Sequence, residues 1–279
     1  HRYKMPELPE VETIAAALSR AVVGEKIVKI EVFSPAMRTP LTPLLYAHLE
    51  GRQITSVRRR ARYLIIGLDD ERCILMHFGM SGVIRLEGAE VPKRKHEHIF
   101  LYLSGGMILR FECPRRFSIC EVHSDLATTG VPRELESRLG VEPLTPDFSG
   151  EYLYSVSRNR KNPVKNFIMD NAIVVGVGNI YATESLFAAG ISPLRPAGEL
   201  TRPEAEKLTT EIKTILKRAI AAGGSTIRDY RHVDGSEGKF AQTLLMYGHA
   251  GEPCPRCGSI IECVKLGGRS SCYCPECQK

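Results

Sequence analysis

The sequence of 279 residues contains no run of about eighteen consecutive apolar residues, and so lacks the feature that indicates a membrane-spanning helix. Its first residues are basic and polar and show no signal-peptide pattern. Internal repeats and low-complexity segments are also absent, which excludes repeat and compositionally disordered architectures. We therefore expect a cytoplasmic protein without a membrane partner.

Two common nucleotide-binding motifs are incomplete. Residues 169–182 read MDNAIVVGVGNIYA, with glycines at 176 and 178. This segment lacks the third glycine of a dinucleotide fingerprint and the Lys-Ser/Thr pair of a P-loop. We expect instead a tight turn, with Asn179 capping a helix whose first amides can bind a phosphate. An ordinary helix-turn-helix corner fits these residues equally well.

Charge of one sign is only slightly in excess, with 38 Lys and Arg against 32 Asp and Glu and a net charge of +6. Any single basic run is typical of a solvated surface, but several runs on a weakly basic chain favour a polyanion such as nucleic acid. The basic runs are Arg58, Arg59, Arg60 and Arg62; Lys93, Arg94 and Lys95; Arg115 and Arg116; and Arg158, Arg160, Lys161 and Lys165.

Nine cysteines in a long chain without an export signal favour reduced thiols or metal ligands over disulfides. Three of them lie in strand-like stretches and are expected to be inert core thiols. These are Cys73, Cys113 and Cys120.

Four further cysteines form two Cys-x-x-Cys pairs that are separated by sixteen residues. This spacing predicts a structural zinc site with four thiolate ligands, and a redox Cys-x-x-Cys is the alternative. The predicted ligands are Cys254, Cys257, Cys274 and Cys277.

The residues between the two cysteine pairs predict a β-hairpin. Residues 259–265 and 270–273 have strand character, and two glycines between them place Arg269 near the turn. Cys263 and Cys272 fall outside the paired spacing, so we predict that they are not ligands. The metal would then hold Arg269 towards an anionic partner.

The rest of the chain divides into a β-rich first half and a helical second half. With 43% hydrophobic residues, it can form two or three domains. The short strand-like runs of the first half predict a sandwich or barrel. Strands are expected at 26–32, 54–57, 63–68, 73–78, 99–103 and 107–111, and helices at 132–139, 179–189 and 202–222.

The stretch Met5-Pro6-Glu7 can carry chemistry. If Met5 is an initiator that is removed, Pro6 offers a free secondary amine, and α-amino groups titrate near ~8. Such an amine can attack a sugar C1′ carbon to form an iminium, with Glu7 moving protons. The alternative is that the prolines only open a helix. Its apolar face would be Val11, Ile14, Leu18 and Val22, and Gly24 would end it.

Several motifs occur in one fixed order along nearly the whole chain. They are PELPEVET at 6–13, HFGMSG at 77–82, PRRF at 114–117, MDN through GVGNIYA at 169–182, and the terminal cysteine pairs. This ordered set resembles the bacterial formamidopyrimidine-DNA glycosylase family, whose members are DNA repair enzymes.

The resemblance implies an α+β multidomain fold with three parts. A β-sandwich with a leading helix would span 6–130, a helix-two-turns-helix domain 131–245 and a zinc finger 246–279. One structural Zn²⁺ would be bound. The protein would act as a monomer on damaged double-stranded DNA held in the cleft between domains, in a bacterial cytoplasm and at its nucleoid.

The resemblance also implies roles for individual residues. Pro6 would be the nucleophile, Glu7 the adjacent acid, and Arg269 a phosphate ligand and proton donor, with Arg62 at a further catalytic position. DNA-contacting positions would be His96, Arg115 and Arg160, with Lys165 and Asn179 on phosphates. A wedge that fills the gap left by the displaced base would comprise Met80, Arg115 and Phe117.

Each of these residues also has a plainer interpretation. Met80 and Phe117 lie beside strand-like runs and could be core residues, and His96 could be a surface histidine. Three positions depart from the family pattern: Arg62 stands in place of a lysine, Cys113 in place of an aspartate and Ser118 in place of a glycine. We predict that residues 1–5 are a misplaced start or a remnant absent from the mature protein.

Residues 222–230 and 234–242 resemble a loop that oxidised-purine members fold over the displaced base. This favours excision of 8-oxoguanine and formamidopyrimidines, followed by β- and δ-elimination at the abasic sugar. One alternative is an endonuclease VIII-like enzyme for oxidised pyrimidines. A second is a protein that binds lesions or abasic sites without turnover, if Pro6 is blocked.

Overall fold

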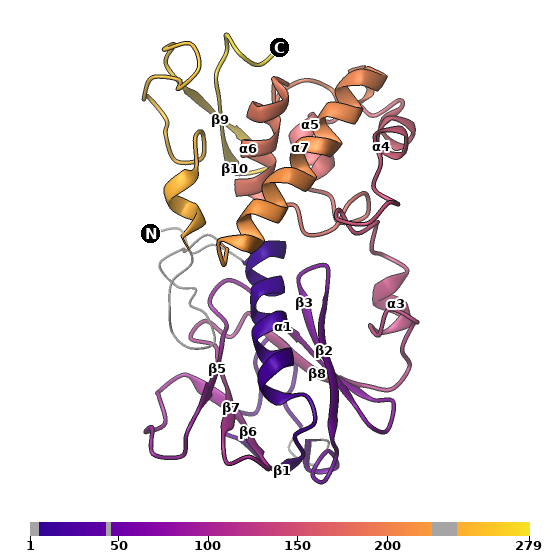
Figure 1. Cartoon of the computed structure of the whole chain (residues 1–279), viewed down its shortest axis with the longest axis vertical. Helices are drawn as coiled ribbons and strands as arrows, with labels where there is room; N and C mark the ends of the chain where they lie inside the picture. Colours follow the sequence, from indigo (N-terminus) through magenta and orange to yellow (C-terminus); the bar gives the residue numbers. More distant parts are fainter. Residues whose placement is uncertain (1–5, 43–45, 225–238) are drawn as a thin grey trace. The chain divides into compact units, whose positions relative to one another are not determined.

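The computed structural model describes residues 6–42, 46–224 and 239–279. The chain forms two compact units (Figure 1). The first contains residues 1–137 and 222–241, and the second contains residues 138–221 and 242–279.

The first unit begins with helix α1 (Leu8–Val22). Pro9 lies in its first turn, where the amide hydrogen that proline lacks has no helical partner. The predicted apolar face is fully buried, at Val11, Ile14, Leu18 and Val22. The helix ends before Gly24, which has a φ of +94°, so both the helix and its end are confirmed.

Two antiparallel four-stranded sheets form a β-sandwich, which confirms the predicted fold class. Side chains from both sheets and from α1 share one apolar core. One sheet has the order β1-β6-β7-β5, with strands Ile27–Val32, Glu97–Leu103, Ile108–Glu112 and Val83–Glu87. The other has the order β2-β3-β4-β8, with strands Ile54–Arg60, Tyr63–Leu68, Cys73–His77 and Ile119–His123.

Six of the eight sandwich strands were predicted, within a few residues at their ends. Strands β5 and β8 were not. Each has only five residues, and much of each is only partly buried, so its hydrophobic alternation is weak. Their pairing partners β7 and β4 are distant in sequence, and tertiary pairing therefore decides their conformation.

The second unit is mainly helical, as predicted. The helices expected near 179–189 and 202–222 are α6 (Asn179–Ala189) and α7 (Arg202–Ala221). Two short helices, α4 and α5, were not predicted, although Ser149 caps α4 by accepting a hydrogen bond from the amide of Tyr152. The helices of this half of the chain are α3 (Arg133–Glu136, in the first unit), α4 (Gly150–Ser157), α5 (Val164–Ile168), α6 (Asn179–Ala189) and α7 (Arg202–Ala221). Short 3-10 helices span Ala197–Glu199 and Phe240–Thr243.

The second unit ends in the predicted hairpin, formed by β9 (Glu262–Leu266) and β10 (Arg269–Tyr273). Gly267 and Gly268 make the turn, and both have positive φ. A small apolar cluster joins this segment to α6 through Phe187, Met246 and Ile261. Arg256 fixes the same contact, since its guanidinium donates to the carbonyl of Phe187 at 2.8 Å.

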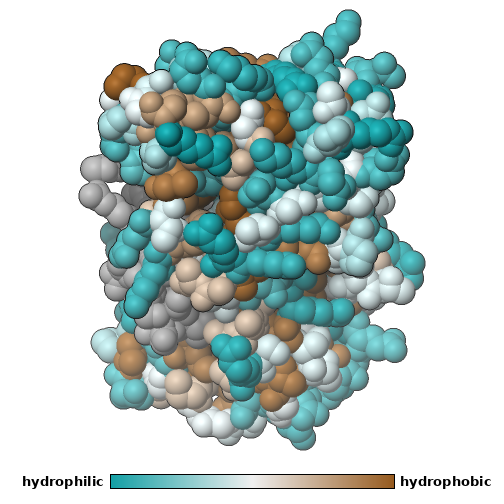
Figure 2. Space-filling model, turned by 45° about the horizontal axis from the view of Figure 1, so that its top comes forward, coloured by the Kyte–Doolittle hydropathy of each residue, from teal (hydrophilic) through white to brown (hydrophobic). Residues whose placement is uncertain are grey.

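Among the residues that the structure describes, no helix combines the length and apolar character required to cross a membrane. On the face drawn in Figure 2, hydrophobic residues lie in separate small groups among hydrophilic ones.

Candidate functional site

The N-terminus of α1 places two buried carboxylates directly after Pro6. Glu7 is the N-cap residue, and its side chain accepts a hydrogen bond from the backbone at the third helical position. Glu10 reciprocates, because its Oε2 accepts from the Glu7 amide at 3.0 Å. Glu7 is 3% exposed and Glu10 is fully buried. This capping box fixes the Glu7 side chain at the helix end that directly follows Pro6.

The base of the expected lid loop lies at the same helix end. A Cβ on Gly224 would be 3.1 Å from Oε1 of Glu10 and 3.4 Å from its Cα, so this glycine packs directly against the acid. The two arms of the loop pair where Phe240 donates its amide hydrogen to the Gly224 carbonyl at 3.1 Å. The rest of the expected lid, residues 225–238, lies outside the described residues.

Arg62 lies at the tip of the two-residue turn between β2 and β3, beside the end of β4. Tyr63 pairs with His77 across these strands, with ring centroids 5.0 Å apart. Burial, with a smaller effect from the positive charges of Arg62 and Arg38, lowers the pKa of His77 to about 4.

The His77 imidazole is therefore neutral near pH 7. Its Nδ1 accepts the Gly79 amide hydrogen at 3.1 Å, so its proton resides on Nε2. Two guanidinium groups and a neutral ring donor provide an arrangement suited to an anion. No local pattern assigned a role to His77 or to Arg38. Strand register brings His77 beside Arg62, whereas Arg38 lies in the segment after β1, where its amide donates to the Ser118 carbonyl at 3.1 Å.

The predicted wedge residues lie on two neighbouring loops of the sandwich. Met80 is half-buried in the turn after β4, and Phe117 is 49% exposed in the loop before β8. A Cβ on Gly79 would lie 2.6 Å from the Phe117 carbonyl oxygen, so the loops are in close contact. The Arg115 guanidinium lies 5.7 Å from the centre of the Phe117 ring. The core interpretation of Phe117 is therefore wrong.

His96 borders the same region. Its carbonyl accepts from the Cys113 amide at 2.9 Å, directly before the loop that carries Arg115. Cys73, Cys113 and Cys120 are all fully buried, as expected of core thiols. Burial raises the pKa of Cys73 to about 11 and that of Cys120 to about 12, so both are inert thiols at neutral pH.

In the second unit, Lys165 on α5 is buried and links two elements. Its Nζ donates to Asn179 Oδ1 at 2.6 Å, to the Ser270 carbonyl at 3.1 Å and to Ser271 Oγ at 2.6 Å. The prediction that Asn179 caps α6 is wrong. The N-cap is Gly178, and the Asn179 oxygen accepts from the buried ammonium instead.

This arrangement holds the strand that begins with Arg269, whose own side chain is exposed. Arg160 is also exposed, in the loop after α4, and its carbonyl accepts from Gly198 at 2.8 Å. Lys165, Asn179 and the Arg269 hairpin are thus brought together, whereas Arg160 belongs to a separate loop.

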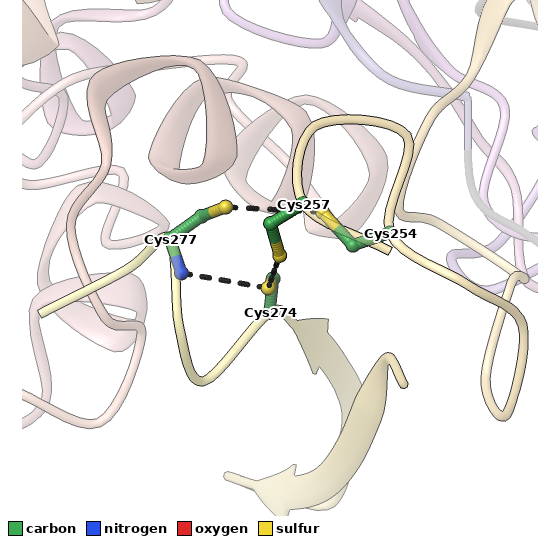
Figure 3. Close-up of side chains that lie close together, drawn as sticks. All are labelled: Cys254, Cys257, Cys274 and Cys277. Carbon is green, nitrogen blue, oxygen red and sulfur yellow. Dashed lines mark hydrogen bonds between the residues drawn. The ribbon is translucent and has the colours of Figure 1, made fainter. Parts of the chain in front are cut away.

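The four predicted zinc ligands converge at the end of the chain (Figure 3). All four sulfur atoms lie within 4.8 Å of one another. The Cys254 and Cys277 sulfurs are 3.9 Å apart, and those of Cys257 and Cys274 are 3.4 Å apart. Tetrahedral Zn–S bonds of about 2.3 Å separate sulfurs by about 3.8 Å, so the set fits a zinc ion.

Backbone amides complete the sulfur environment. The Arg256 amide donates to Cys254 Sγ, and the Cys277 amide donates to Cys274 Sγ, both at 3.4 Å. Such bonds stabilise thiolates. Because all four ligands come from protein, the ion would be structural and not catalytic.

The expectation that the cysteines are reduced thiols or metal ligands is wrong for one pair. Cys263 and Cys272 form a disulfide and occupy directly opposite positions on β9 and β10. Opposite residues of an antiparallel pair bring their Cβ atoms close enough for this bond. The prediction that neither is a zinc ligand agrees with the cysteine cluster, which does not include them.

Comparison with known proteins finds three matched domains, in the same order along the chain as the β-sandwich, the helical part and the cysteine-bearing hairpin. Family models match residues 5–120 (formamidopyrimidine-DNA glycosylase N-terminal domain), 139–231 (formamidopyrimidine-DNA glycosylase H2TH domain) and 251–279 (zinc finger found in FPG and IleRS). Formamidopyrimidine-DNA glycosylases of Serratia proteamaculans and Hahella chejuensis are 48% and 46% identical to this chain. Each match covers 99% of this chain and 100% of the relative.

Solved structures agree. A Lactococcus lactis FPG mutant bound to DNA containing Fapy-dG has a TM-score of 0.89 and 34% identity, over 98% of this chain and 100% of that one. The Lactococcus lactis enzyme with abasic-site DNA has a TM-score of 0.89 and 33% identity, over 98% and 99% of the two chains. The fold and cysteine cluster, with these matches, define a DNA glycosylase, an enzyme of DNA repair. The chain belongs to the formamidopyrimidine-DNA glycosylase family.

Proposed function

We propose that this enzyme excises oxidised purines from double-stranded DNA and then cleaves the strand at the resulting abasic site. The observation that carries the proposal is the position of Pro6 directly before Glu7, whose side chain is oriented by the capping box with Glu10. Relatives named for formamidopyrimidine excision, and similar structures with Fapy-dG or abasic DNA, support the same substrate class.

In the proposed mechanism, the Pro6 nitrogen attacks C1′ and the damaged base leaves with a proton supplied through Glu7. The amine proton then passes to O4′ as the C1′–O4′ bond opens, which leaves an iminium between the proline nitrogen and C1′. The iminium acidifies C2′, so β-elimination breaks the C3′–O bond and δ-elimination breaks the C5′–O bond. Hydrolysis of the iminium releases Pro6. The reaction requires that the Pro6 nitrogen carries no acyl group, because an amide nitrogen is not nucleophilic.

The remaining residues are proposed to bind and shape the DNA. Asn179 and the exposed Arg269 would contact phosphates, and the buried Lys165, whose ammonium donates to three protein oxygens, would orient them. The fixed positive charge of Arg269 would stabilise the phosphate that leaves in the second elimination. Arg62 would hold a phosphate through its fixed positive charge. His96, Arg115 and Arg160 would contact DNA, and Met80, Arg115 and Phe117 would fill the gap left by the displaced nucleotide.

The proposed zinc ion, held by the four clustered cysteines, would supply no reaction chemistry. Its ligands anchor the segment that carries β9 and β10, and so would keep Arg269 in place. The enzyme is proposed to act as a monomer.

Borohydride trapping tests the proposal on a duplex containing 8-oxoguanine. Protein whose intact mass shows Pro6 as its first residue should yield a covalent protein–DNA adduct, because borohydride reduces the iminium to a stable amine. Protein that retains residues ahead of Pro6 is the matched control and should yield none. Equal excision by both proteins would contradict the proposed nucleophile. A protein that binds lesions without turnover would give neither product nor adduct.

A second candidate substrate is an oxidised pyrimidine. The Lactococcus lactis enzyme has been solved with DNA containing an oxidised pyrimidine, and that structure has a TM-score of 0.88 against this chain. Parallel single-turnover measurements on duplexes with 8-oxoguanine and with thymine glycol separate the two. We expect faster release of 8-oxoguanine, and the reverse order would favour the endonuclease VIII-like alternative.

A further inference from the structure

The side chain of Ser118 lies between the two loops that carry the proposed wedge. Ser118 is fully buried, and its Oγ lies 2.7 Å from the Phe78 carbonyl oxygen and 2.8 Å from Cys113 Sγ. Phe78 begins the turn that carries Met80, and Cys113 begins the loop that carries Phe117. A single hydroxyl therefore contacts the base of both loops.

The Phe78 carbonyl also closes the Met80 turn. It accepts the Gly82 amide hydrogen at 2.7 Å, in addition to the Ser118 hydroxyl. A Cβ on Gly82 would lie 2.5 Å from Ser118 Oγ and 2.4 Å from the Phe78 oxygen, so the backbone of this turn reaches the serine only because residue 82 is glycine. The turn and the serine are thus in direct contact.

Cys113 fixes the second loop in a similar way. Its amide donates to the His96 carbonyl at 2.9 Å, and its own carbonyl accepts from Arg116 at 3.3 Å, which folds the loop back. A hydroxyl has one proton, so donation to the Phe78 carbonyl leaves the Ser118 oxygen to accept from the Cys113 thiol. Cys113 and Ser118, two of the positions that depart from the family pattern, therefore contact one another.

We propose that Ser118 is a positioning residue that holds Met80 and Phe117 in a fixed relative arrangement, so that both enter the DNA base stack as one body. This inference rests on the proposed function, because it assigns the two residues to the wedge. Insertion of a preformed wedge offsets the cost of unstacking the damaged nucleotide. If the loops move independently, the entropy lost on ordering them reduces the free energy that wedge insertion releases.

The experiment compares Ser118→Ala with Ser81→Ala. Ser81 lies in the same turn and is 6% exposed, but its hydroxyl has no hydrogen-bond partner among the described residues. Both variants lose one buried hydroxyl beside the wedge, and only the first loses the contact between the loops. Single-turnover excision of 8-oxoguanine is measured in two duplexes. In one, the lesion has fully paired neighbours, and in the other, mismatched neighbours already unstack it.

We expect Ser118→Ala to slow excision from the fully paired duplex by roughly three- to tenfold, the effect of losing one hydrogen bond. Excision from the mismatched duplex should be unchanged, and Ser81→Ala should match the unmodified protein on both. Fluorescence of 2-aminopurine beside the lesion should show slower unstacking only for Ser118→Ala.

Two results would overturn the inference. If Ser118→Ala slows excision equally on both duplexes, Ser118 serves folding alone. If it slows excision on neither duplex, Ser118 does not position the wedge. If the unmodified protein with Pro6 first neither excises the base nor forms the borohydride adduct, the proposed function itself fails. That outcome is distinct from a defect confined to Ser118→Ala.

Discussion

The ammonium group of Lys165 donates a 2.6 Å hydrogen bond to the side-chain oxygen of Asn179, and the same nitrogen bonds to Ser270 and Ser271 on the zinc-finger hairpin. The Asn179 amide group is thereby oriented with its NH₂ available as a donor. One buried cation thus organises two residues proposed to contact phosphate, Asn179 itself and the exposed Arg269.

Replacement of Lys165 by methionine should weaken DNA binding more than replacement of an exposed lysine. We expect the dependence of log K on log salt concentration to fall by about one, because Arg269 loses its phosphate contact when the Lys165 bonds no longer hold its hairpin in place. Lys217→Met is the control, since Lys217 is exposed on α7. Fluorescence anisotropy at several salt concentrations measures both, and identical salt slopes for the two variants would exclude the proposed role.

Arg62→Lys tests the departure from the family pattern. Arginine keeps a positive charge but does not donate its proton, whereas lysine can. We expect the variant to change excision rate or lesion preference by roughly tenfold, with DNA affinity changed by about twofold or less. Single-turnover rates on 8-oxoguanine and thymine glycol duplexes, measured beside anisotropy, give both values. Unchanged rates and preference would refute the idea that Arg62 alters the chemistry.

The lowered pKa of His77 predicts a pH-dependent stability. Between the ordinary value of 6.5 and the folded value of about 4, the unfolded chain binds a proton that the folded chain does not. The free energy of unfolding is therefore unaffected by His77 above pH 6.5. As the pH falls from 6.5 towards 4, His77 lowers this free energy by up to about 1.4 kcal/mol per pH unit.

His77→Gln removes this titration. Urea unfolding at pH 7 and at pH 5 should show a smaller loss of unfolding free energy for the variant than for the unmodified protein. Equal losses would mean that His77 is not the residue responsible.

Zinc binding should depend on the four clustered cysteines and not on the disulfide pair. Mass spectrometry of metal content should find one zinc ion per chain in the unmodified protein and in Cys263→Ser, and none in Cys274→Ser. Loss of the ion should also make hydrogen exchange faster in β9 and β10 of Cys274→Ser, because their metal anchor is lost. Retention of zinc by Cys274→Ser would contradict the assigned ligand set.

The sequence by itself determined the elements whose signal is local. The apolar spacing of Val11, Ile14, Leu18 and Val22 defined α1, and the two Cys-x-x-Cys pairs defined the four-cysteine cluster, because each pattern lies within one short stretch of the chain. The ordered motifs indicated the family and its fold class.

Tertiary structure decided the contacts that depend on strand register and on long-range packing. Register placed His77 beside Arg62 and set Cys263 opposite Cys272, and packing brought the Asn179 oxygen to Lys165 in place of a capping role. The contact of Ser118 with both Phe78 and Cys113 has the same origin. Residues far apart in sequence meet only after the sheets pair and the cores close, so no local pattern encodes these distances.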